Sequence, residues 1–120
     1  QNLNLLLAKA SMAAIIQDIE TEIETLKKII KINPITNVKS LLAQAYLRKN
    51  DGIVNEFIKK LIDEVLFEKP KDPGANFILA KYLNQNGNKN KSRNLLLKIL
   101  KNLDDKGPWH QIYKDELNIK

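Results

Sequence analysis

The sequence predicts an all-α fold, and three observations support that prediction. A short leucine–alanine phrase occurs three times in the 120 residues, at Leu6–Ala10, Leu41–Ala45 and Ile78–Tyr82. Its alanines Ala8, Ala43 and Ala80 lie 35 and 37 residues apart, a period typical of stacked helical hairpins. Gly and Pro number only four each, and alternating runs of β-branched and aromatic residues are absent.

Composition fits one domain over residues 1–120. The hydrophobic content of 43% is enough for a single core or one continuous seam between hairpins. Cys is absent, which excludes disulfides and thiolate metal sites. The apolar stretch from Leu3 to Ile16 is interrupted by polar residues and is shorter than the roughly 20 residues needed to span a bilayer. We therefore expect a core helix there. Because the chain begins at Gln1 and not at Met, we expect a processed or excised form.

The first unit, approximately residues 1–36, is expected to form a helical hairpin. Its first helix is rich in alanine, which lets a second helix approach closely. After a turn at Gln17-Asp18, apolar residues recur at helical spacing from Ile19 to Ile30. Acidic residues cluster at the start of this second helix and lysines at its end, as the helix dipole favours. Pro34 ends the helix.

The second and third units, approximately 37–72 and 73–105, repeat this plan. In the second unit we expect a first helix, a turn at 49–52 and a second helix with apolar residues from Ile53 to Val65. The buried face of the first helix is expected to consist of Val38, Leu41, Leu42, Ala45 and Tyr46. In the third unit, the turn is expected at 86–88. Gly107-Pro108 then begins a capping helix over 107–119, with Trp109 buried beneath it.

This layout resembles the tetratricopeptide repeat family. The resemblance rests on recurrence of the large–small pair of the first helix, seen as Leu7-Ala8, Leu42-Ala43 and Leu79-Ala80. Tyr46, Gly87, Ser92 and Pro34 match further family positions, whereas Asn50 stands where a turn glycine is usual. The resemblance implies hairpins stacked as a short right-handed superhelix. An irregular helical bundle is the alternative, and it would also be all-α.

Members of this family bind protein or peptide segments in a concave groove lined by the first helix of each repeat. The resemblance implies a groove here at Lys9, Met12, Asn37, Ser40, Gln44, Arg48, Phe77, Lys81, Asn84 and Gln85. Amides and cations dominate this set, and they suit an extended backbone or an acidic partner. Solvated helix faces are the competing interpretation. Leu5 and Ser40 occupy positions where the family's carboxylate clamp has cations, so chaperone tails are not the expected ligand.

Catalysis is not expected, because no set of nucleophile, base and orienting residue is visible. The single histidine, His110, has no second histidine or cysteine with which to share a metal, and no cofactor is implied. Nucleic acid or an anionic surface is the alternative partner, because the net charge is +6 and cations concentrate between Lys81 and Lys106. All but two of the 20 cations are Lys, which makes poorer bidentate phosphate contacts than Arg, and this favours a protein partner.

Overall fold

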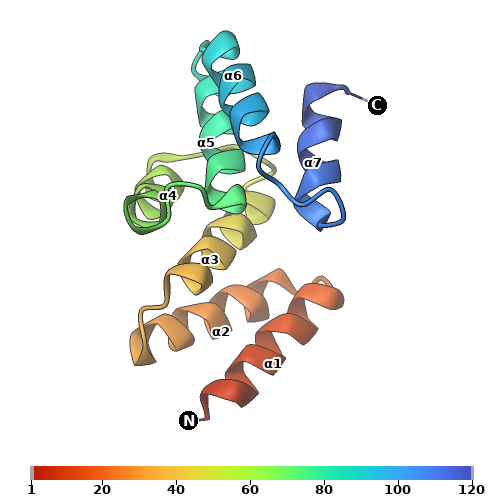
Figure 1. Ribbon diagram of the computed structural model, residues 1–120. Helices are drawn as coiled ribbons and strands as arrows, with labels where there is room; N and C mark the ends of the chain where they lie inside the picture. Colours follow the sequence, from red (N-terminus) through yellow and green to blue (C-terminus); the bar gives the residue numbers. More distant parts are fainter. Residues whose placement is uncertain (1, 120) are drawn as a thin grey trace.

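The computed structural model describes residues 2–119 as seven α-helices joined by short connections (Figure 1). In chain order they are α1 (Leu3–Ile15), α2 (Ile19–Ile32), α3 (Thr36–Lys49), α4 (Glu56–Glu68), α5 (Pro73–Gln85), α6 (Lys89–Leu100) and α7 (Pro108–Leu117). No strand occurs over the described range, which confirms the all-α prediction. Within this range no helix is both long enough and apolar enough to cross a membrane.

Short polar side chains begin most of the helices. Asn2, Asp18, Asn55 and Asp72 each accept a hydrogen bond from a backbone N–H of the first turn of α1, α2, α4 and α5 respectively. Thr21 donates hydrogen bonds to the Asp18 carboxylate from its side chain, which has the larger effect, and from its backbone N–H. Both lower the pKa of the Asp18 carboxyl group. Prolines open α5 and α7, where a missing N–H costs nothing.

The turns between paired helices use left-handed backbone conformations. Gly87 supplies this conformation between α5 and α6, with φ of 85°. The first hairpin has no glycine, and Gln17 adopts φ of 61° instead. The second turn has both Asp51 and Gly52 at positive φ and is longer, because α4 begins only at Glu56. Ile53 therefore precedes the second helix and is exposed, whereas the sequence placed it on that helix.

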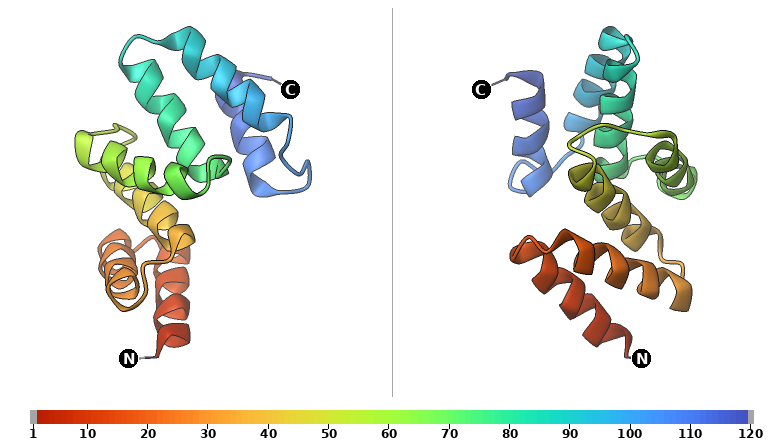
Figure 2. Two further views of the ribbon diagram at one scale, coloured as in Figure 1. Left: turned by 60° about the vertical axis from the view of Figure 1, so that its left-hand side comes forward. Right: turned by 180° about the vertical axis from the view of Figure 1, so that it is seen from behind.

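Neighbouring helices pack in sequence along the molecule. Each helix contacts the next from α1 to α6, and α7 packs against both α6 and α5. In addition, α3 contacts α5, whereas α4 contacts neither α2 nor α6 over residues 2–119. Figures 1 and 2 place α1 at one end of the molecule and α6 at the other. The molecule measures 44 × 32 × 26 Å.

Buried apolar side chains form three successive clusters along this stack. The first joins α1, α2 and α3, the second joins α3, α4 and α5, and the third joins α5, α6 and α7. Ala43 and Ala80 are fully buried, as the recurring phrase predicts. Close approach at Ala80 also lets the Ser92 hydroxyl of α6 donate a 2.7 Å hydrogen bond to the Ala80 carbonyl oxygen. The fold is thus a row of hairpins that share seams, as a helical repeat or a bundle would be.

Three expectations about buried residues were wrong. Ala8 is exposed and Ala10 is buried in its place, because α1 carries apolar residues on both sides and the phrase alone does not say which side is inside. Leu41 is 46% exposed, because it faces away from the seam that Val38 and Leu42 enter. Trp109 is only partly buried, and Tyr113, one helical turn later, is the fully buried aromatic residue of α7.

Candidate functional site

Two of the residues expected to line a groove hold α3 against the start of α5. The Ser40 hydroxyl is buried and donates a 2.8 Å hydrogen bond to the Asp72 carboxylate, which also caps α5. Gln44 donates to the Ser40 oxygen over 3.2 Å. Gly74 lies directly against them, since a Cβ atom there would come within 2.4 Å of the Gln44 amide nitrogen. These side chains therefore fix the crossing of α3 and α5.

Phe77 and Lys81 of the expected groove lie beneath α7. The Phe77 ring centroid is 5.7 Å from that of Trp109 and 5.7 Å from that of Tyr113. The Lys81 ammonium lies 5.0 Å from the Phe77 ring centroid and 3.4 Å from a Glu116 carboxylate oxygen. Both residues thus attach α7 to α5, and their main contacts are within the chain.

Gln85, another residue of this set, binds the long turn of the second hairpin. Its side-chain amide donates a 2.7 Å hydrogen bond to the Gly52 carbonyl oxygen and accepts one of 3.0 Å from the Val54 N–H. The three extra residues of that turn need such a partner, because their backbone groups lie outside any helix. Gln85 is therefore a structural residue of the α3–α4 connection.

Arg48 and Asn37, both on α3, form polar contacts with neighbouring elements. The Arg48 guanidinium lies 2.6 Å from a carboxylate oxygen of Glu22, whose side chain is only 8% exposed. This ion pair borders a depression of about 460 Å³ that Ala14, Gln17 and Ile19 also line. Asn37 accepts a 2.6 Å hydrogen bond from the Lys69 ammonium. Arg48 remains half exposed, so the side of its guanidinium away from Glu22 can receive a second anion.

The three remaining residues, Lys9, Met12 and Asn84, are exposed. Asn84 lies in the last turn of α5. Lys9 and Met12 lie on the outer side of α1, where Leu5, Ile15 and Ile16 are also strongly exposed. The expectation of a core helix over Leu3 to Ile16 did not include this exposed apolar surface. The signal was available, because a helix that is apolar on all sides needs cover on all sides.

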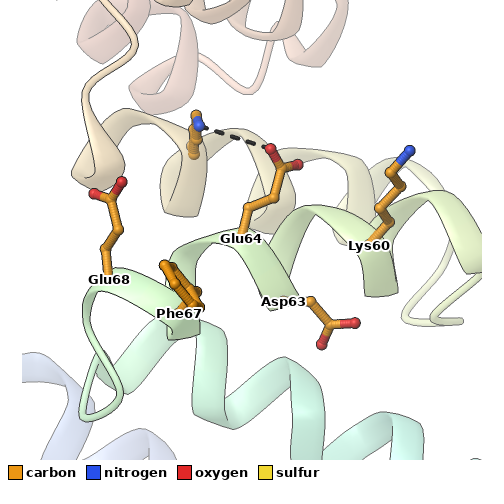
Figure 3. Close-up of a pocket in the computed structure, with 6 residues that line it drawn as sticks. Lys60, Asp63, Glu64, Phe67 and Glu68 are labelled. Carbon is orange, nitrogen blue, oxygen red and sulfur yellow. Dashed lines mark ion pairs between the residues drawn. The ribbon is translucent and has the colours of Figure 1, made fainter.

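Figure 3 shows a shallow depression on the outer side of α4, lined by Lys39, Lys60, Asp63, Glu64, Phe67 and Glu68. Lys39 and Glu64 form a 3.7 Å ion pair across it, and Asp63 points away from that pair. Glu68 accepts a hydrogen bond from the Thr36 hydroxyl. The carboxylates therefore do not converge on a common point. In the described part of the chain, no three His, Cys, Asp or Glu side chains gather closely enough to hold a metal ion.

The net positive charge of the chain arises from one stretch of the sequence. Residues 69–106 contain nine Lys or Arg and three Asp, which gives the same +6 as the whole chain. Helix α6 carries Lys89, Lys91, Arg93 and Lys98 without an acidic residue, and all four are exposed. The remaining residues are electrically balanced. Long-range attraction to a polyanionic partner is therefore expected to be strongest at residues 69–106, which include α6.

Comparison with family models, with curated proteins and with solved structures found no match to this chain. Its function therefore has to be inferred from the packing of the helices and from the surfaces that they leave exposed.

Proposed function

We propose that the chain is a non-catalytic protein-interaction module that binds a segment of a partner protein on the surface formed by α3, α5 and α7. One observation carries this proposal. Helix α5 contacts both α3 and α7, whereas α4 contacts neither α2 nor α6 in the described part of the chain. A stack that is closely packed on one side and open on the other curves toward the packed side. This curvature, together with the recurring sequence phrase, supports a tetratricopeptide-like arrangement whose inner surface is made by α3, α5 and α7.

The exposed chemistry of this inner surface suits an extended peptide. On α3, the row from Asn37 through Leu41 to Arg48 follows helical spacing and offers an amide, an apolar side chain and a guanidinium. Asn84 adds a second amide on α5. Amides can hydrogen-bond a peptide backbone, and the exposed side of Arg48 can pair with a carboxylate. The proposed ligand is therefore an extended segment with an acidic residue opposite Arg48 and an apolar residue opposite Leu41.

Variants that test this surface must leave the fold intact. Lys9→Glu with Lys81→Glu, at two cations of the expected groove, is unsuitable because Lys81 joins α5 to Glu116 of α7. Leu41 and Asn84 are better positions, because Leu41 is 46% exposed and neither side chain makes a hydrogen bond over residues 2–119. Lys28 of α2 and Lys60 of α4 are exposed on the even-numbered helices and provide a matched control.

The experiment is a selection from a displayed peptide library, followed by fluorescence polarisation with the selected peptides. We expect the affinity to fall more than about tenfold in Leu41→Glu with Asn84→Glu, a loss of roughly 1.4 kcal/mol or more. The control Lys28→Glu with Lys60→Glu should bind as the wild-type chain does. Equal losses in both variants, or a selection that yields no binding peptide, would contradict the proposed function.

An anionic polymer such as nucleic acid is the second candidate, favoured by the confinement of the net charge to residues 69–106. In that case, binding should weaken steeply with salt, with a logarithmic slope of about 0.9 per phosphate neutralised on duplex DNA. Lys91→Glu with Lys98→Glu on α6 would then abolish binding, and Leu41→Glu with Asn84→Glu would not.

A further inference from the structure

Helix α1 is apolar on two opposite sides, and only one of them is buried. Leu6, Ala10 and Ala13 face the core and are at most 7% exposed. On the other side, Leu5, Ala8, Met12 and Ile15 recur at intervals of three or four residues, and Ile16 extends the row. The exposed fractions of the large members are 70% for Leu5, 59% for Met12, 76% for Ile15 and 65% for Ile16. We call these five residues the α1 outer face.

Over residues 2–119, the other helices do not cover this face. Of the described helices, only α2 runs along α1, and it does so on the buried side. Figures 1 and 2 show α1 at one end of the molecule, where no helix other than α2 runs beside it among the described residues. The four large side chains together expose roughly 500 Å², an area as large as the most extensive apolar patch on a typical monomer. Patches of this size in water mark interaction surfaces.

We infer that the α1 outer face binds the same face of a second copy of this chain, with the two α1 helices antiparallel. In such a pair, residues whose numbers add to about 20 lie opposite each other. Leu5 then faces Ile15 of the second copy, so that two large apolar side chains meet, and Ala8 faces Met12 of the second copy, so that a long side chain meets a small one. This self-complementarity is what a two-fold interface requires, because each residue meets its partner twice.

Charge does not oppose this association. Lys9, at the edge of the face, is the only charged residue between positions 1 and 17. The net charge of +6 lies in residues 69–106, which include α6 at the opposite end of the molecule. Two copies that meet through α1 therefore keep their positive regions far apart, beyond the Debye length of about 8 Å at physiological salt.

The small area of the α1 outer face limits the expected dimer to a weak one. Two outer faces together bury at most roughly 1,000 Å², which is below the range of about 1,200–2,000 Å² for stable complexes and fits a weak dimer. We therefore expect a dissociation constant on the order of micromolar, and an equilibrium between monomer and dimer that depends on protein concentration.

Sedimentation velocity across about 1–500 µM protein tests the inference over that affinity range. The wild-type chain should move from monomer toward dimer, whereas Met12→Glu and Ile15→Glu should stay monomeric with unchanged helicity. Phe67→Glu on α4 is the matched control, because Phe67 is 89% exposed but lies outside the α1 outer face, and this variant should dimerise normally. A wild-type chain that stays monomeric, or that binds lipid vesicles as a monomer, would overturn the inference, as would loss of the dimer in Phe67→Glu.

Disulfide trapping tests the antiparallel register in a chain that has no cysteine of its own. Positions 5 and 15 lie about 15 Å apart along one helix, so Leu5→Cys with Ile15→Cys cannot form a bond within one copy. Oxidation should yield a covalent dimer linked between positions 5 and 15 of opposite copies, as identified by mass spectrometry. Links joining 5 to 5 or 15 to 15 would contradict the antiparallel arrangement.

Discussion

The hydroxyl of Tyr113 on α7 donates a 2.6 Å hydrogen bond to the carbonyl oxygen of Pro73, the first residue of α5. The ring of Tyr113 is fully buried and forms part of the third apolar cluster. One residue thus supplies both apolar contact and a polar link between α7 and the start of α5. Burial, together with the nearby negative charge of Asp72, raises the pKa of Tyr113 above its ordinary value near 10.

Tyr113→Phe should destabilise the fold by about 1 to 1.5 kcal/mol at neutral pH, because it leaves the Pro73 carbonyl oxygen without its donor. The raised pKa adds a dependence on pH. Above about pH 10, tyrosine in the unfolded chain loses its proton while buried Tyr113 keeps it, so the stabilisation present below pH 10 is progressively lost as the pH rises.

Thermal melts of both proteins between about pH 8 and 11 measure this effect. Lysines also titrate in this range, but they are common to both proteins, so the difference in melting temperature isolates Tyr113. The stability advantage of the wild-type chain should shrink above pH 10. A difference that stays constant across the range would show that Tyr113 is not titrating as its burial implies.

The three alanines of the recurring phrase should respond differently to Leu. Ala43→Leu and Ala80→Leu place a large side chain in a closed helix crossing and should each cost about 1 to 3 kcal/mol. Ala8→Leu is the matched control, because Ala8 is exposed and should change stability by less than about 0.5 kcal/mol. Chemical denaturation measures all three. A large cost at Ala8 would mean that its side of α1 is already covered within one chain.

The contrast among these alanines shows how far the sequence could predict the fold. The helices and turns of the hairpins follow from apolar spacing and from glycine and proline positions, because these act locally. The rotation of α1 about its own axis cannot be predicted from these local signals, because Ala8 and Ala10 lie on opposite sides of a helix that is apolar all round. Only the position of α2 decides which of them is buried.

The expected groove shows a different limit. Sequence spacing places Ser40, Phe77 and Lys81 on one side of their helices, and that much requires only helical geometry. Whether such a side chain meets solvent or a neighbouring helix depends on the packing of α3, α5 and α7. That packing is set by contacts between residues about 30 to 40 positions apart, such as Ser40 with Asp72 and Tyr113 with Pro73.

Gln85→Ala should loosen the α3–α4 connection. The change removes the hydrogen bonds to Gly52 and Val54 and leaves the partly buried Val54 N–H unpaired, at a cost of about 1 to 2 kcal/mol. Hydrogen exchange at Val54 should quicken more than exchange in the helix cores. Asn84→Ala, at the adjacent exposed position, should alter neither stability nor exchange at Val54. Equal effects of the two substitutions would show that Gln85 does not hold this turn in place.

Arg48→Met should destabilise the chain through Glu22. The Glu22 side chain is 8% exposed, and over residues 2–119 its one hydrogen-bonding partner is Arg48. Removing the guanidinium leaves a largely buried carboxylate unpaired, which should cost about 1 to 3 kcal/mol. Glu22→Gln combined with Arg48→Met should recover much of this loss, because a neutral amide is cheaper to leave without a charged partner.

The pair formed by Lys49 and Glu20 provides the control for this cycle. Its distance is 3.0 Å, close to that of the Arg48 pair, but both side chains are about half exposed or more. Solvent screens such a pair, so Lys49→Met should cost less than about 0.5 kcal/mol. Urea denaturation of the four proteins of the Glu22–Arg48 cycle, with Lys49→Met beside them, measures the coupling directly. A coupling energy near zero for Glu22 and Arg48 would show that burial of the carboxylate does not make this ion pair stronger than its exposed neighbour.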